Sequence, residues 1–156
     1  MALGTYNTDQ AAIQVAPTPS TLLAFSKSGG KTRVFTPSYT LATTESAAET
    51  LTLIQLYKGD VVHTNLCSVY CPNPGTALVL DIGDDDSDGV DPDRYVDNLV
   101  ASAGGTFVFS AGGTASVTQA TPYTVVEDCL MQATFVTATS LNAVKLSFTI
   151  VISRNN

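Results

Sequence analysis

The sequence is poor in charge and in the residues on which most catalytic and metal sites depend. It has no tryptophan, one histidine and three cysteines, and charged residues make up 13% of its 156 residues. Ordinary soluble domains carry about 25% charged residues. A single histidine excludes a histidine-rich metal site, or a pair of histidine bases, within one chain. With 44% hydrophobic residues, the chain is nevertheless expected to fold rather than to remain disordered.

Basic residues and long apolar runs are also scarce. Seven lysines and arginines against fourteen acids give a net charge of -7, whereas a nucleic-acid binder needs a basic face. The longest apolar stretches, such as 77–80 and 150–152, are far shorter than the ~20 residues of a membrane-spanning helix. The first ten residues have no basic start and no apolar run, so no secretory signal is evident. We expect a soluble single domain made in the cytoplasm, with no nucleic-acid or membrane partner.

The charge that is present gathers in one segment. Residues 81–97 contain eight aspartates and one arginine, and the remaining six acids are balanced by six bases. Threonine, serine, asparagine and small apolar residues must therefore cover most of the surface, which is cheap to desolvate. This favours extensive burial against partner subunits. Composition supports equally well a threonine-rich all-β domain that is simply soluble.

The chain divides into an arm and a β domain. Residues 1–32 have no sustained hydrophobic period and include Pro17, Pro19 and the Gly29-Gly30 pair, which predicts an extended N-terminal arm or irregular lead-in. Residues 33–156 have the alternation of β-strands. We therefore set the domain boundary between 32 and 33.

Alternating hydrophobicity predicts an all-β fold. Residues 144–152 have the cleanest period of two, and residues 49–57 change phase between Leu53 and Ile54, as a β-bulge would require. Residues 61–70 and 123–136 are also expected to be strands, and 94–101 a short helix or strand. No segment holds a helical period over three turns. About eight strands separated by turn signals predict a jelly-roll-like antiparallel β-sandwich.

Catalysis has little support in the sequence. His63 is interpreted as a strand residue that is solvated or satisfied by one hydrogen bond. There is no Gly-x-Ser-x-Gly elbow, phosphate-binding loop or dinucleotide fingerprint. We therefore predict that the protein is not an enzyme.

Cys67, Cys71 and Cys129 are expected to be reduced, partly buried thiols. Four residues of straight strand span roughly 13 Å, beyond the ~7 Å that a disulfide allows between α-carbons. An odd number of cysteines without an export signal also favours free thiols. His63, Cys67 and Cys71 could be imagined as zinc ligands, but their spacing matches no recognised finger.

The acidic segment 81–97 has the spacing of a partial calcium loop. Asp84, Asp86 and Asp88 precede a glycine in the order D-x-D-x-D-G, in which alternate carboxylates can converge on one ion. The second half of the motif fails, because Tyr95 stands where an EF-hand needs a bidentate glutamate. Crowded carboxylates repel one another, so the segment either binds a cation such as Ca²⁺ or extends into solvent. No other cofactor is expected.

Several stretches resemble a known family. One strand ends in a Leu-x-Lys-Gly turn, and a later strand ends in Gly-Asp before an aspartate-rich loop with the segment D-P-D-R-Y. This pattern resembles the head decoration (cement) proteins and related virion structural proteins of tailed bacteriophages. The resemblance covers about residues 31–154, and the matching stretches are 31–34, 51–62, 76–84, 91–95, 128–134 and 146–153.

The family resemblance implies a role as well as a fold. It implies a jelly-roll-like sandwich, commonly a homotrimer on the capsid shell, without enzymatic activity and with the major capsid protein as partner. It also suits an arm at residues 1–32 that reaches over neighbouring subunits. The sequence departs from the pattern at Tyr57, where proline is common, and in its rich acidic loop.

Two hypotheses for function follow. The first is a phage virion protein at the head surface that decorates or cements the capsid through subunit contacts alone. The alternative is a calcium-dependent carbohydrate-binding or adhesion module, with Tyr70, Tyr95 and Tyr123 as stacking platforms for sugars. The absence of tryptophan, the usual stacking residue, weakens the alternative.

Overall fold

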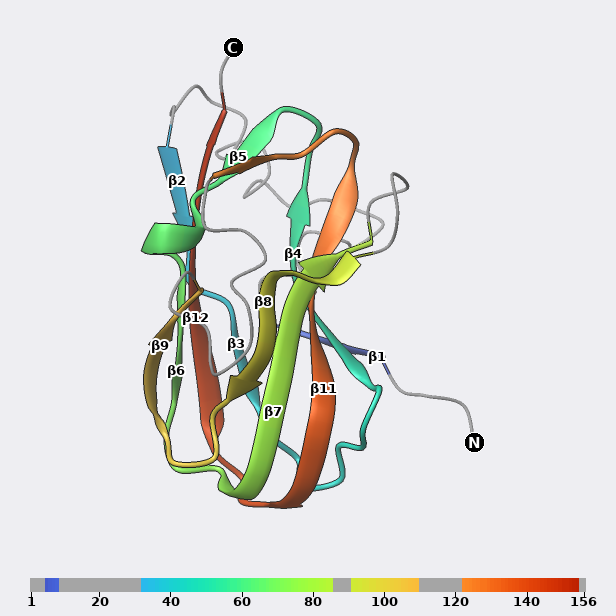
Figure 1. The fold of residues 1–156 in the computed structure, drawn as a ribbon, viewed down its shortest axis with the longest axis vertical. Helices are drawn as coiled ribbons and strands as arrows, with labels where there is room; N and C mark the ends of the chain where they lie inside the picture. Colours follow the sequence, from blue (N-terminus) through green and yellow to red (C-terminus); the bar gives the residue numbers. More distant parts are fainter. Residues whose placement is uncertain (1–4, 9–31, 86–90, 110–121, 155–156) are drawn as a thin grey trace.

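The chain folds as two facing β-sheets (Figure 1). A computed structural model describes residues 5–8, 32–85, 91–109 and 122–154. Within these ranges the only helix is a 3₁₀ turn, η1 (Thr64–Leu66), and all other regular elements are strands. The predicted all-β sandwich is confirmed.

Most of the first sheet is antiparallel. Its strand order is β1, β4, β11, β7, β8, and only β1 lies parallel to its neighbour. β11 is the central strand, paired with β4 on one side and β7 on the other. The strands are β1 (Thr5–Asn7), β4 (Thr50–Leu56), β11 (Cys129–Leu141), β7 (Gly75–Asp84) and β8 (Asp91–Val100).

The second sheet is organised around β12 (Lys145–Arg154), the strand with the clearest alternation in the sequence. Four short strands pair with it: Ile152 has partners in both β2 and β5, and Ser147 has partners in both β3 and β6. β10 then pairs with β5, and β9 with β6. These strands are β2 (Thr32–Phe35), β3 (Ser38–Thr40), β5 (Asp60–Val62), β6 (Ser68–Cys71), β9 (Gly105–Val108) and β10 (Tyr123–Thr124).

The core lies between the sheets and follows the predicted alternation. In β12 the residues Leu146, Phe148, Ile150 and Ile152 are buried, as the period of two predicts. The predicted bulge is also present, because Met131 pairs with Ile54 while Gln132 pairs with Thr52, which leaves Leu53 as the extra residue. Both Leu53 and Ile54 are fully buried.

Two segments expected to be single strands are divided. Residues 61–70 are broken by η1 into β5 and β6, and residues 123–136 are divided between β10 in the second sheet and β11 in the first. Hydrophobic alternation does not reveal when a chain leaves one sheet for the other, because both sheets bury the same kind of face. The uncertain segment 94–101 is a strand up to Val100.

Part of the predicted N-terminal arm is described. Residues 5–7 form β1 on the edge of the first sheet, whereas residues 1–4 and 9–31 lie outside the described ranges. The arm and its boundary at residue 32 remain a prediction.

Candidate functional site

Asp84, the first predicted calcium ligand, is buried at the end of β7. The Tyr95 hydroxyl donates a hydrogen bond to its Oδ2 at 2.6 Å, and the Arg94 Nε donates to its Oδ1 at 3.1 Å. The Arg94 guanidinium also lies over the Tyr123 ring, 4.4 Å from the centroid. Burial and the adjacent Asp84 charge raise the pKa of Tyr95, so its hydroxyl keeps the proton that it donates. These contacts join β7, β8 and β10.

The other two predicted ligands, Asp86 and Asp88, lie outside the described residues. Among the residues that are described, no three histidine, cysteine, aspartate or glutamate side chains gather closely enough to hold a metal ion. The calcium interpretation of Asp84, Asp86 and Asp88 therefore remains a prediction. The carboxylate of Asp84 already has an arginine and a tyrosine as partners.

Neighbouring aspartates are crowded but fixed by the fold. Burial raises the pKa of Asp81, whose Oδ1 accepts a hydrogen bond from the Asn98 backbone N–H at 2.7 Å. A hydrogen bond with Asp91 raises the pKa of Asp93, since a proton shared between two carboxyls is held more tightly. The ionised forms of both carboxyls are therefore disfavoured by their surroundings, while the Asp81 side chain still accepts a backbone hydrogen bond from β8.

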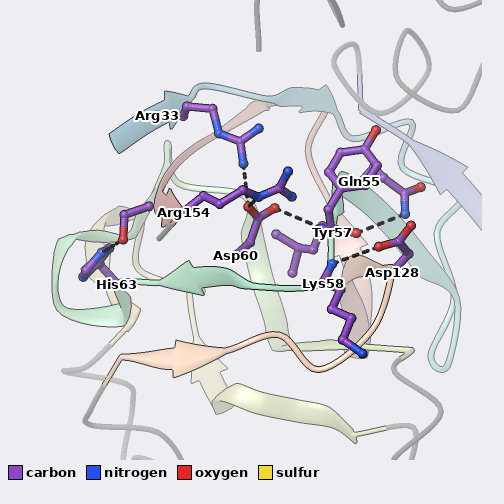
Figure 2. Close-up of polar contacts among 10 residues, drawn as sticks. Arg33, Gln55, Tyr57, Lys58, Asp60, His63, Asp128 and Arg154 are labelled. Carbon is purple, nitrogen blue, oxygen red and sulfur yellow. Dashed lines mark hydrogen bonds and ion pairs between the residues drawn. The ribbon is translucent and has the colours of Figure 1, made fainter. Parts of the chain in front are cut away.

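A second buried carboxylate, Asp60, was not singled out by the sequence (Figure 2). Its Oδ1 accepts hydrogen bonds from Arg33 Nη2 at 2.6 Å and from Arg154 Nε at 2.9 Å. Its Oδ2 accepts one from the Tyr57 backbone N–H at 2.9 Å. The Leu-x-Lys-Gly turn noted in the sequence lies directly before it, and Gly59 adopts a φ of +85° there.

The Asp60 cluster holds together three strands of one end of the second sheet. Arg33 is in β2, Asp60 in β5 and Arg154 in β12. The two arginines stand 27 and 94 residues away from Asp60. Sequence offers no signal for such a long-range pairing, and the arrangement leaves the carboxylate fully engaged in structural contacts.

His63 and the cysteines also have structural surroundings. A ring nitrogen of His63 lies 2.8 Å from Ser153 Oγ, which agrees with the interpretation of a histidine satisfied by one hydrogen bond, although His63 follows β5 rather than lying within a strand. Cys67, Cys71 and Cys129 are free and buried. Burial raises the pKa of Cys67 and Cys71 to about 11, so both thiols are protonated and poor nucleophiles near neutral pH.

The outward-facing side of the second sheet carries little charge. Register partners share a face, so the outward residues of β12 define those of the flanking strands. Val34 and Tyr70 on this side are 61% and 50% exposed. Among its described residues, the only charged one is Lys145. We call this surface the outer face of the second sheet; it comprises Thr32, Val34, Ser38, Thr40, Val61, Ser68, Tyr70, Thr106, Val108, Thr124, Lys145, Ser147, Thr149 and Ser153, whereas Val151 in the same register is buried.

The three tyrosines of the carbohydrate hypothesis do not form a common platform. Tyr95 is fully buried, so its predicted role in stacking on sugars is wrong. Arg94 covers one side of the Tyr123 ring. Tyr70 is exposed on the outer face of the second sheet. Burial of Tyr95 could not be foreseen, because the sequence spacing suggested a calcium ligand at Asp84 and gave no sign that this carboxylate accepts a hydrogen bond from Tyr95.

Comparison by sequence and comparison by structure give different results. No protein-family model matches the sequence, and no curated protein matches it significantly. Within the described ranges, no helical segment has the length and apolarity that crossing a membrane requires.

Two solved structures from phage capsids share the architecture. A chain in the capsid of Ralstonia phage GP4 aligns with a TM-score of 0.67 and 14% sequence identity, covering 98% of this chain and 99% of that one. A chain in the capsid asymmetric unit of cyanophage Pam1 aligns with a TM-score of 0.59 and 14% identity, covering 81% and 87%. The chain therefore has the same β-sandwich fold as these two capsid components.

Proposed function

We propose that the protein is a structural component of a bacteriophage virion that decorates or cements the head. The observation that carries this proposal is the likeness of fold, over nearly the full length of both chains, to a component of the Ralstonia phage GP4 capsid. A second phage capsid component has the same architecture. The mechanism is binding alone, and no reaction is proposed.

The outer face of the second sheet is the proposed attachment surface. Among the described residues of this face, only Lys145 is charged. Burying the face therefore removes little charge from water, and desolvation of charge is a large cost of forming an interface. Val34, Tyr70 and Val108 supply exposed apolar area there. We propose the major capsid protein as the partner and the head surface as the location.

A homotrimer is the proposed oligomer. Several weak contacts presented together to a symmetric shell bind more tightly than one contact alone, because each later contact forms at a high effective concentration. Apart from the buried Asp84, the described acidic residues of 81–97 lie outside this face and would remain in water.

Binding to capsids tests the proposal directly. The purified protein is mixed with capsid shells of its own phage and sedimented, and its mass in free solution is measured by light scattering. We expect a trimer that sediments with the shells, and binding that saturates at a fixed number of trimers per shell. A monodisperse monomer that stays in the supernatant would overturn the proposal.

A further inference from the structure

The short strand β1 is held by more contacts than its length suggests. Thr8, which follows it, is fully buried. Its backbone N–H donates to the Thr52 carbonyl at 2.8 Å, and its hydroxyl donates to the Leu53 carbonyl at 2.6 Å. Leu53 is the extra residue of the β4 bulge. The bulge thus presents a carbonyl to which a side chain of the added strand binds.

Tyr6 supplies a second anchor for the same segment. Its hydroxyl donates to Glu49 Oε2 at 3.0 Å, and its ring packs against Tyr39 with the centroids 5.6 Å apart. The Tyr39 hydroxyl in turn donates to Glu45 Oε1 at 2.9 Å. The hydrogen bond with Glu49 raises the pKa of Tyr6, as expected for a hydroxyl that donates to a carboxylate.

These anchors form a receptor for residues 5–8 on the edge of the first sheet. It consists of the edge of β4, the bulge carbonyl of Leu53, Glu49 and the Tyr39 ring. An edge strand with free backbone groups readily accepts a further strand, and here parallel pairing satisfies that edge. The anchoring contacts described above are made by residues 5–8 themselves, so the same segment of a neighbouring copy can supply them.

We propose that residues 5–8 are exchanged between copies, the segment of one chain occupying the β4 edge of another. Residues 9–31, which join this segment to β2, number 23, enough to reach about 80 Å when fully extended. Exchange conserves the contacts of Tyr6 and Thr8 described above, so the choice between the two arrangements depends on linker entropy and on local concentration. Copies held side by side favour exchange, because the receptor of a neighbour is then within reach.

This inference rests on the proposed function only in assuming that several copies assemble together. It specifies how copies are joined to each other and says nothing of the surface that contacts the shell. Shell binding and strand exchange can therefore fail separately.

Cysteine pairing across the β1–β4 register tests the exchange. Thr5 and Thr50 are register partners, and strands lie about 4.8 Å apart, within the roughly 4.4–6.8 Å between α-carbons that a disulfide spans. One full-length chain carries Thr5→Cys and a second, distinguishable by a tag, carries Thr50→Cys. The two are co-expressed and mildly oxidised. A covalent pair containing one chain of each kind is expected.

Matched variants make every outcome decisive. In the double variant Thr5→Cys/Thr50→Cys, exchange gives covalent oligomers. The proposal would be overturned if the double variant formed crosslinks only within single chains and the two singly substituted chains formed no mixed pair. Absence of any crosslink would overturn it too, since β1 would then not occupy the β4 edge. Adding Thr8→Val removes the hydroxyl that binds Leu53 at nearly constant size, and should lower the yield of the mixed pair several-fold. The wild-type chain, whose native thiols are buried, should give none.

Discussion

The acidic segment 81–97 and the outer face of the second sheet differ sharply in charge. In the acidic segment, the buried carboxylate of Asp84 forms an ion pair with Arg94 and accepts a hydrogen bond from Tyr95. On the outer face, small polar and apolar side chains dominate, and Lys145 is the only charged described residue. Charge is thus concentrated in one segment, and a broad surface elsewhere can be dehydrated at low cost.

The largest effect is expected inside the acidic segment. Asp84→Ala leaves Arg94 and the Tyr95 hydroxyl without their buried acceptor and should lower the free energy of unfolding by about 3 kcal/mol. Urea denaturation measures it. Asp93→Ala is the matched control, because it removes a carboxylate whose pKa is raised by its neighbour Asp91 and should be neutral or slightly stabilising. Equal effects of the two substitutions would contradict a distinct role for Asp84.

The next effect concerns the outer face. Tyr70→Asp places a charge on the proposed attachment surface, and burying it without a partner should weaken capsid binding by about 100-fold, or roughly 2.7 kcal/mol. Thermal stability should change little, since Tyr70 is half exposed. Val100→Asp adds the same charge to an exposed apolar residue of β8, in the other sheet, and should bind normally. If both variants bind like wild type, the outer face is not the attachment surface.

A smaller effect, on the pH dependence of stability, is expected from the two buried thiols at the ends of the segment 67–71, which contains β6. The pKa of Cys67 and of Cys71 is raised by burial from an ordinary 9.0 to about 11, so the folded state retains protons that the unfolded chain releases. This contribution to stability is complete below about pH 9 and is lost as the pH rises through about 11. At pH 10 the loss should be about 1 kcal/mol for each thiol. Urea denaturation from pH 8 to 10.5 measures it.

A variant that lacks these two thiols isolates their effect from that of other titrating groups. The Cys67→Ala/Cys71→Ala variant should lose part of the alkaline slope whatever its stability at neutral pH. An unchanged slope would show that the two thiols titrate alike in the folded and unfolded chains.

The smallest effect is expected from calcium. Because Asp84 is engaged by Arg94 and Tyr95, millimolar Ca²⁺ should shift the melting temperature by less than about 1 °C, well under 1 kcal/mol. Thermal melting with and without EDTA measures it. A rise of several degrees that EDTA reverses, and that Asp86→Ala/Asp88→Ala abolishes, would instead favour the calcium-dependent binding module.

Much of the fold could be predicted because local patterns express it. The alternation in 144–152 marks the central strand β12, and the phase change at Leu53 marks the bulge in β4. The Leu-x-Lys-Gly turn is also present, with Gly59 at a positive φ and the Asp60 N–H donating to the Tyr57 carbonyl. In each case the signal and the structure occupy the same few residues.

Contacts between distant residues could not be predicted in this way. The pairing of Asp60 with Arg33 and Arg154, and the division of residues 123–136 between two sheets, depend on which segments meet after folding. Tyr95 illustrates the same limit, since its residue type suits an exposed platform as well as a buried hydroxyl donor.

Composition and short-range alternation were enough to establish the β class, the confinement of net charge to residues 81–97 and the scarcity of catalytic groups. The folded chain was needed to show which carboxylates are paired inside the molecule, which face of the second sheet points outward with little charge, and where β1 binds. These properties belong to pairs of segments far apart along the chain, whose meeting is selected by the free energy of the whole fold.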